Sequence, residues 1–356
     1  MSDVSRVNGR DTAPSFTVLA KIAVGHGAVS GIAISPDGTQ LVVAHYGEDA
    51  LSLIDTAKGA VTQTVIDIDE PFAIATAHAP AGRVYVNVVS AAYDSILAFD
   101  VDACRVVATY PVAHSLTDLT VSPDGSHVYA SRAAVNGADV AILDITTGEQ
   151  DAIGIAATAG TTAECVRVSS DGCRLYVAAN GPSTAQLVVI DTHQNRVRGA
   201  VEIGSPIRDI ALSPDGTTAY VGSCGSDFGA VLDVVDTRTD IVTNTYKVGE
   251  VAGFLAQLTL SRDGERAYLV GDNGVTVLST STHDVVGSIA IAAQPSCVIE
   301  SPDGKRLYIA DYAGTVTVLA IGSTTASVDT RMLDDEPTVP NQWAPHRLLG
   351  LEPSPA

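Results

Sequence analysis

Ser35-Pro36-Asp37-Gly38 is the stretch that decides the fold, because the same four residues return along the chain at regular intervals. Further intact copies stand at Ser122–Gly125, Ser213–Gly216 and Ser301–Gly304, and degenerate copies at Ala79–Gly82, Ser169–Gly172 and Ser261–Gly264. Proline presets the first corner of a turn, aspartate can bond its own backbone, and glycine accepts a positive φ. Apolar alternation flanks each copy, so each copy is predicted to be a tight turn between two strands.

The spacing of these turns predicts the architecture. The seven closing glycines are 40 to 48 residues apart, and a period of about 40 to 50 residues with several short strands is typical of a β-propeller blade. The last unit, from Pro295 to Ile321, has only three strands, whereas an extra strand is predicted at Phe16–Val24. We therefore predict an all-β protein, a single seven-bladed β-propeller of four-stranded antiparallel blades, closed by the N-terminal strand joining the last blade.

The repeat also divides the chain. We expect a flexible N-terminal segment over residues 1–15, the propeller over residues 16–321 and a proline-rich tail over residues 322–356. The tail carries the chain's only tryptophan, Trp343, among several prolines that exclude a helix or a central strand. Either the tail is a flexible extension, or Trp343 anchors it on a partner or on the ring.

A second repeated pattern carries a family resemblance. Arg83-Val84-Tyr85-Val86-Asn87 has relatives at Tyr176-Val177 and Tyr220-Val221, and strands such as Leu53-Ile54-Asp55-Thr56 follow at a steady offset. Together with the turns, these residues resemble the YVTN repeat of bacterial and archaeal seven-bladed propellers, which are WD40-like. The resemblance covers about residues 16–321 and implies the same fold. We expect the recurring tyrosine to pack between blades and the strand-ending aspartate to cap the next turn.

Composition limits the classes of partner. The chain has 41 acidic and 20 basic residues, for a net charge of −21, so nonspecific attraction to nucleic acid or to an anionic membrane is not expected. No apolar run is long enough to span a bilayer, and residues 1–15 lack the apolar core of a secretory signal. These features predict a cytoplasmic monomer, although the resemblance implies export or surface display as an alternative. The five cysteines are scattered over different blades, which favours free thiols over a disulfide framework.

Function is expected where the turns vary. The Ser-Pro-Asp-Gly turns all fall on one face of a propeller, and the irregular loops gather on the opposite face around the central channel. The candidate ligand-binding residues on that face make a polar and largely acidic mouth. They are His26, His45, Glu70, His114, Asp118, Arg132, Glu164, Arg208, Asp209 and Asp311. Two further charges, Arg167 and Glu300, interrupt inner strands and are expected to face the channel and to need a partner.

Three kinds of chemistry would fit this mouth. Histidines with Glu70 are ordinary ligands of a transition metal, carboxylates such as Glu164 and Asp311 suit Ca²⁺, and a histidine base beside an arginine suits a lactonase. No local motif supports any of them, so no catalytic residue, metal ligand or cofactor is assigned. We predict a noncatalytic binding or scaffolding module that recognises a protein or small-molecule partner on the loop-rich face. The alternative is a lactonase-like hydrolase with its active site at the same mouth, and in either case the acidic mouth is expected to select cations or cationic partners.

Overall fold

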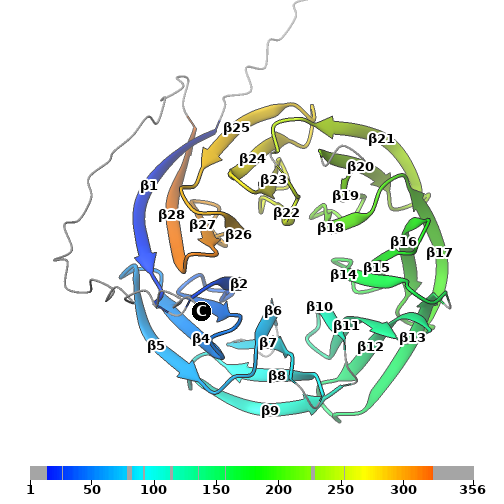
Figure 1. The fold of residues 1–356 in the computed structure, drawn as a ribbon, viewed down its shortest axis with the longest axis horizontal. Helices are drawn as coiled ribbons and strands as arrows, with labels where there is room; N and C mark the ends of the chain where they lie inside the picture. Colours follow the sequence, from blue (N-terminus) through cyan, green and yellow to red (C-terminus); the bar gives the residue numbers. More distant parts are fainter. Residues whose placement is uncertain are drawn as a thin grey trace, which may run out of the picture. The chain divides into compact units, whose positions relative to one another are not determined.

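Seven four-stranded antiparallel sheets are arranged around a central axis in this protein (Figure 1). The computed structural model describes residues 14–323, apart from residues 26, 78–81, 91–92, 113–114, 135, 157, 226–228 and 252. Each sheet is one blade, and in blades one to six the strands follow each other in chain order from the axis outward, whereas β1 is the outer strand of blade seven. The predicted seven-bladed propeller is therefore confirmed.

The strand bounds follow the sequence repeat closely. Blade one consists of β2 (Val29–Ile34), β3 (Gln40–His45), β4 (Ala50–Asp55) and β5 (Ala60–Ile66). Blade two consists of β6 (Pro71–Thr76), β7 (Arg83–Val88), β8 (Ser95–Asp100) and β9 (Arg105–Pro111). Blade three consists of β10 (Leu116–Val121), β11 (His127–Ala134), β12 (Gly137–Asp144) and β13 (Gln150–Ala156). Blade four consists of β14 (Thr162–Val168), β15 (Arg174–Asn180), β16 (Ala185–Asp191) and β17 (Arg196–Ile203).

The remaining three blades complete the ring. Blade five consists of β18 (Ile207–Leu212), β19 (Thr218–Cys224), β20 (Ala230–Asp236) and β21 (Ile241–Val248). Blade six consists of β22 (Gln257–Leu260), β23 (Arg266–Gly271), β24 (Gly274–Ser279) and β25 (Val285–Ala290). Blade seven consists of β26 (Pro295–Glu300), β27 (Arg306–Asp311), β28 (Thr315–Ser323) and, from the other end of the fold, β1 (Pro14–Ala23).

The N-terminal strand closes the ring, as the sequence predicts. β1 runs antiparallel to β28, with Pro14 opposite Ser323 and Ala23 opposite Thr315 (Figure 1). The strand begins at Pro14 rather than at residue 16, and β28 continues to Ser323 rather than to residue 321. Because β1 supplies the outer strand, β28 has no unpaired edge.

The Ser-Pro-Asp-Gly turns owe their shape to one carboxylate each. In the first turn, the Ser35 hydroxyl donates to Asp37 Oδ1 at 2.6 Å, and the Thr39 N–H donates to the same oxygen at 3.0 Å. Gly38 takes a φ of 73°, which a side chain would strain. The strand-ending aspartate acts similarly, since Asp55 Oδ1 accepts the N–H groups of Ala57 and Lys58. Both aspartates therefore have the predicted structural role.

The core lies between neighbouring blades. The recurring tyrosines Tyr85, Tyr176, Tyr268 and Tyr308 are fully buried, and Tyr176 shares one apolar cluster with Ile210 and Val221 of the next blade. This is the packing role predicted for them. All five cysteines are free thiols, and no helix in the described part of the chain could cross a membrane.

Candidate functional site on the loop-rich face

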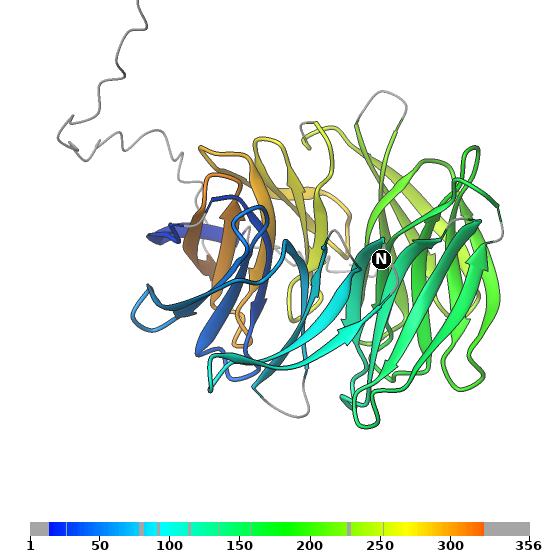
Figure 2. The same ribbon diagram turned by 60° about the horizontal axis from the view of Figure 1, so that its bottom comes forward.

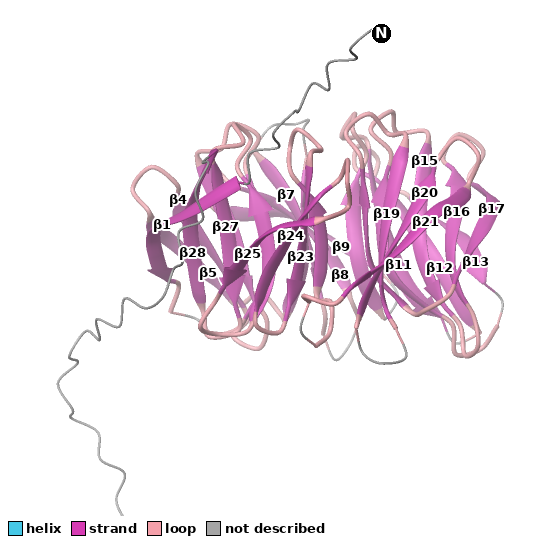
Figure 3. Cartoon of the chain, turned by 90° about the horizontal axis from the view of Figure 1, so that it is seen from above, coloured by secondary structure: helices cyan, strands magenta, loops and turns pink. Residues whose placement is uncertain are grey.

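The strands run between two faces of the ring, and loops join them at both faces (Figure 2, Figure 3). One face carries the Ser-Pro-Asp-Gly turns. The other, called here the loop-rich face, carries the loops that lead into each inner strand and those that join the second strand of a blade to the third. This assignment follows from the antiparallel order of the strands in every blade.

Exposed aromatic side chains gather on the loop-rich face. Among the described residues, every Phe or Tyr side chain that is exposed belongs to this face, with 43–49% of its surface accessible. These residues are Tyr46, Phe72, Tyr93, Phe254 and Tyr312. The repeated tyrosines inside the blades are buried, so the exposed rings are not part of the repeat. Aromatic residues are enriched where proteins bind partners, so exposed aromatic side chains on one face mark that face as a candidate interaction site.

Two of these rings meet between blades one and two. Tyr46, in the loop between β3 and β4, meets Phe72 of β6 edge-on, with ring centroids 6.0 Å apart and an interplanar angle of 79°. The carboxylate of Glu70 lies beside the Tyr46 hydroxyl and raises the pKa of Tyr46. Asp49 Oδ1 accepts the N–H of Glu70 at 2.9 Å, and the Asp49 carbonyl accepts the N–H of Ile68 at 2.9 Å. These two bonds hold the loops of blades one and two together.

A third exposed ring, that of Phe254, has a cationic side chain of the same chain over one face. The guanidinium carbon of Arg208, at the start of β18, lies 5.8 Å from the centre of the Phe254 ring. This distance allows an attraction between the positive charge and the negative face of the ring. Arg208 is one of the predicted site residues, and the structure places it on this aromatic side chain.

Two other predicted site residues, Asp118 and Asp209, are joined through Arg167. The Arg167 guanidinium on β14 pairs with the Asp118 carboxylate on β10 and, at 2.6 Å, with Asp209 Oδ1 on β18. Asp209 Oδ2 also accepts the Leu258 N–H of blade six at 2.9 Å. Burial by itself would lower the pKa of Arg167. The negative charges of the two carboxylates raise that pKa by more, so it lies above its ordinary range. This network links blades three to six, so its role is to stabilise the ring.

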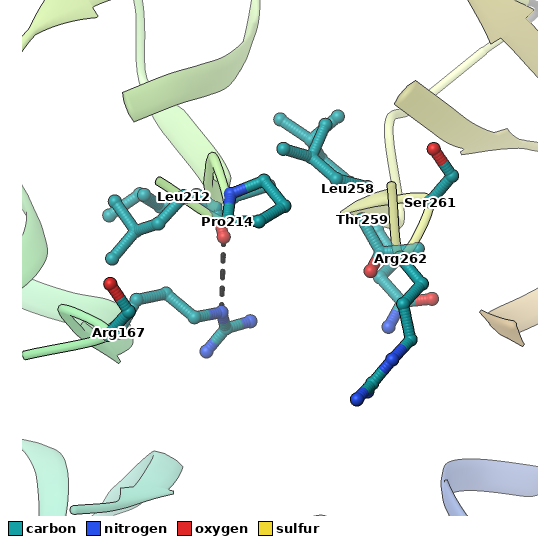
Figure 4. Close-up of a pocket in the computed structure, with 12 residues that line it drawn as sticks. Arg167, Leu212, Pro214, Leu258, Thr259, Ser261 and Arg262 are labelled. Carbon is teal, nitrogen blue, oxygen red and sulfur yellow. Dashed lines mark hydrogen bonds between the residues drawn. The ribbon is translucent and has the colours of Figure 1, made fainter. Parts of the chain in front are cut away.

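Arg167 also lines a cavity near the face of the ring that carries the Ser-Pro-Asp-Gly turns. The cavity has a volume of about 620 Å³ and is bounded by β14, β18 and β22 together with residues of the Ser-Pro-Asp-Gly turns. Figure 4 shows Arg167 and Arg262 reaching toward it, with the Arg167 Nε donating to the Ile210 carbonyl at 3.1 Å. Arg167 thus finds its partners on adjacent strands. Glu300, the other inner-strand charge, accepts the Tyr268 hydroxyl at 2.7 Å, and burial raises the pKa of Glu300.

Four more predicted site residues form hydrogen bonds or ion pairs within their own blades. His45 is fully buried, with its Nε2 2.9 Å from the Ser52 hydroxyl. Arg132 forms a two-point ion pair with Asp139. Glu164 accepts the Thr162 hydroxyl at 2.8 Å. Asp311 Oδ1 accepts the N–H groups of residues 313 and 315 and is also buried.

The predicted residues therefore do not converge as one set. His26 and His114 lie outside the described residues. Within the part of the chain that is described, no three His, Cys, Asp or Glu side chains are placed to hold a metal ion. Sequence reasoning also missed Phe72 and Phe254. The available signal was an aromatic residue at the entrance to an inner strand, where other units have small or polar residues.

Comparison with known proteins agrees with this fold. A family model described as "WD domain, G-beta repeat" matches residues 18–50. The seven-bladed beta-propeller protein Rv1057 of Mycobacterium tuberculosis is 47% identical over 345 residues, which cover 89% of this chain and 87% of that protein. The solved structure of Kuenenia stuttgartiensis hydrazine synthase superposes with a TM-score of 0.73 over 85% of this chain and 98% of that chain. Its 18% identity supports a likeness of fold alone.

Proposed function

The chain belongs to the family of the mycobacterial seven-bladed beta-propeller protein, and from this starting point we propose that it is a noncatalytic binding module. Its partner docks on the loop-rich face. The observation that carries the proposal is the gathering of every exposed Phe and Tyr of the described residues on that face. Aromatic side chains supply large contact area and are enriched where proteins bind partners.

The contacts of the polar residues support binding over catalysis. A lactonase needs a general base and an anion clamp that reach the substrate. His45 is buried against Ser52, Arg132 is held by Asp139, and Arg208 lies over Phe254. These side chains already have partners within the fold, so the lactonase-like alternative has less support.

The proposal is tested with matched variants on the two faces. Wild-type protein, the double variant Tyr46→Ala/Phe72→Ala and the opposite-face variant Asp37→Ala are each immobilised and exposed to a lysate of the source cell. Retained proteins are then quantified by mass spectrometry. We expect at least one protein to be retained by wild type and by Asp37→Ala, and to be lost from the double variant. Retention that is equal on all three, or turnover in a lactone hydrolysis screen, would contradict the proposal.

A further inference from the structure

The surface around Tyr46 and Phe72 is acidic as well as aromatic. It consists of residues 46–49 and 67–72, from two loops and the start of β6, and is called here the acidic–aromatic surface. Five of its residues carry carboxylates, namely Glu48, Asp49, Asp67, Asp69 and Glu70. The only Lys or Arg between residues 24 and 77 is Lys58, and its ammonium pairs with Asp55 Oδ2 at 2.9 Å, at the other end of the blade.

The two rings of this surface are open to solvent, and one carboxylate lies beside them. Tyr46 is 45% exposed and Phe72 is 43% exposed, and the Glu70 carboxylate lies close enough to Tyr46 to raise the pKa of its hydroxyl. The face of an aromatic ring is negative, so it attracts a cation that nearby carboxylates can also pair with. An anionic group would be repelled by the carboxylates, whereas a cation is attracted both by the carboxylates and by the faces of the rings. The negative charge and the exposed rings therefore both favour a cationic ligand.

The described part of the chain contains an example of a cation over an exposed ring. On the same face, Phe254 is 49% exposed and carries the Arg208 guanidinium over its ring. At the acidic–aromatic surface, no Lys or Arg of residues 24–77 is available for the equivalent position, because Lys58 is paired elsewhere. The acidic–aromatic surface therefore presents exposed rings and carboxylates without a cation from residues 24–77.

We propose that the acidic–aromatic surface binds a Lys- or Arg-containing segment of a partner protein. The cationic group lies over the face of one of the two rings, Phe72 or Tyr46, and its charge pairs with Glu70 and the neighbouring carboxylates. This inference rests on the proposed binding function and specifies the chemistry of the partner. Since the carboxylates are at the surface, the attraction is screened by salt, and affinity is expected to fall between low ionic strength and about 0.15 M.

The test is a selection from a random-peptide phage library on the full-length protein. We expect the selected peptides to be enriched in Lys and Arg relative to the unselected library. A fluorescent copy of the most enriched peptide is then titrated by anisotropy against each variant. Phe72→Ala and Glu70→Gln should each weaken binding by about 3- to 30-fold. Glu70→Gln keeps the shape of the side chain, so its effect is separate from any loss of folding.

Tyr312→Ala is the matched control, because Tyr312 is an equally exposed ring on the same face, in blade seven. It should change affinity by less than about twofold if the peptide binds where we propose. Peptides that lack Lys and Arg but respond to Phe72→Ala would overturn the cationic partner and leave the proposed function intact. Peptides that ignore both Phe72 and Glu70, or a selection without binders, would overturn the inference as a whole.

Discussion

Replacing Arg167 with methionine is expected to destabilise the propeller by about 3 kcal/mol at neutral pH. The guanidinium joins β14 to Asp118 on β10 and to Asp209 on β18. Without it, the Asp209 side chain, which is only 5% exposed, keeps its charge and loses its cation. Removing one partner of a buried ion pair typically costs about 3–5 kcal/mol. We take the lower end because the Arg167 side chain is itself 29% exposed and partly screened by water.

The same substitution should make stability depend more steeply on pH. Burial already raises the pKa of Asp209, and Arg167 opposes that effect. Without Arg167 the folded-state pKa of Asp209 rises further, so the folded protein binds a proton that the unfolded chain releases at about pH 4. Stability then falls as pH rises between those two pKa values. The loss caused by Arg167→Met should therefore be larger at pH 7 than at pH 5, with a slope of at most about 1.4 kcal/mol per pH unit.

Urea denaturation followed by circular dichroism measures both effects. Arg167→Met/Asp209→Asn should recover part of the loss, because an uncharged amide can still accept the Leu258 N–H. Arg262→Met is the matched control, since Arg262 lines the same cavity but is exposed, and it should change stability by less than about 0.5 kcal/mol. A loss below about 1 kcal/mol for Arg167→Met, or an equal loss at both pH values, would show that Arg167 does not hold a buried charge at Asp209.

Three further predictions concern closure, turns and a buried acid. Deleting residues 1–23 removes β1 and exposes the edge of β28, so the melting temperature should fall and gel filtration should show association; an unchanged monomer would refute the closing role. Asp37→Ala removes the bonds from Ser35 and Thr39 and should cost about 0.5–1 kcal/mol in urea denaturation, with no effect on binding at the opposite face. Burial raises the pKa of Glu300, so wild type should lose stability relative to Glu300→Gln as pH rises from 5 to 7; parallel pH profiles of the two proteins would count against a buried charge at this position.

The architecture could be predicted because the same kind of turn between two strands is repeated seven times. All seven turns keep the glycine, and six of them keep the aspartate, for reasons confined to a few residues, as at Asp37 and Gly38. The missing strand of the last unit also identified β1 as the closing strand. Local constraints of this kind are visible in a single sequence.

The candidate site was less predictable because it depends on contacts between blades. Asp118 and Asp209 looked like free carboxylates of an acidic mouth, yet both pair with Arg167, which follows Asp118 by 49 residues and precedes Asp209 by 42. His45 looked like an accessible base, but it is the last residue of β3 and points into the blade, where it is fully buried. The strand register decides on which face of the sheet a residue at the end of a strand lies, and the repeat alone does not specify that register at His45. Phe72 was missed because its exposure is a property of the assembled ring.

Site-specific photo-cross-linking can show whether partners dock on the loop-rich face. A photoreactive phenylalanine analogue is placed at Phe72 in one protein and at Asp303, in a Ser-Pro-Asp-Gly turn, in another. Both proteins are irradiated in the source cell. We expect a discrete cross-linked partner from position 72, and none of that mass from position 303. The same cross-linked partner from position 303, with none from position 72, would contradict it.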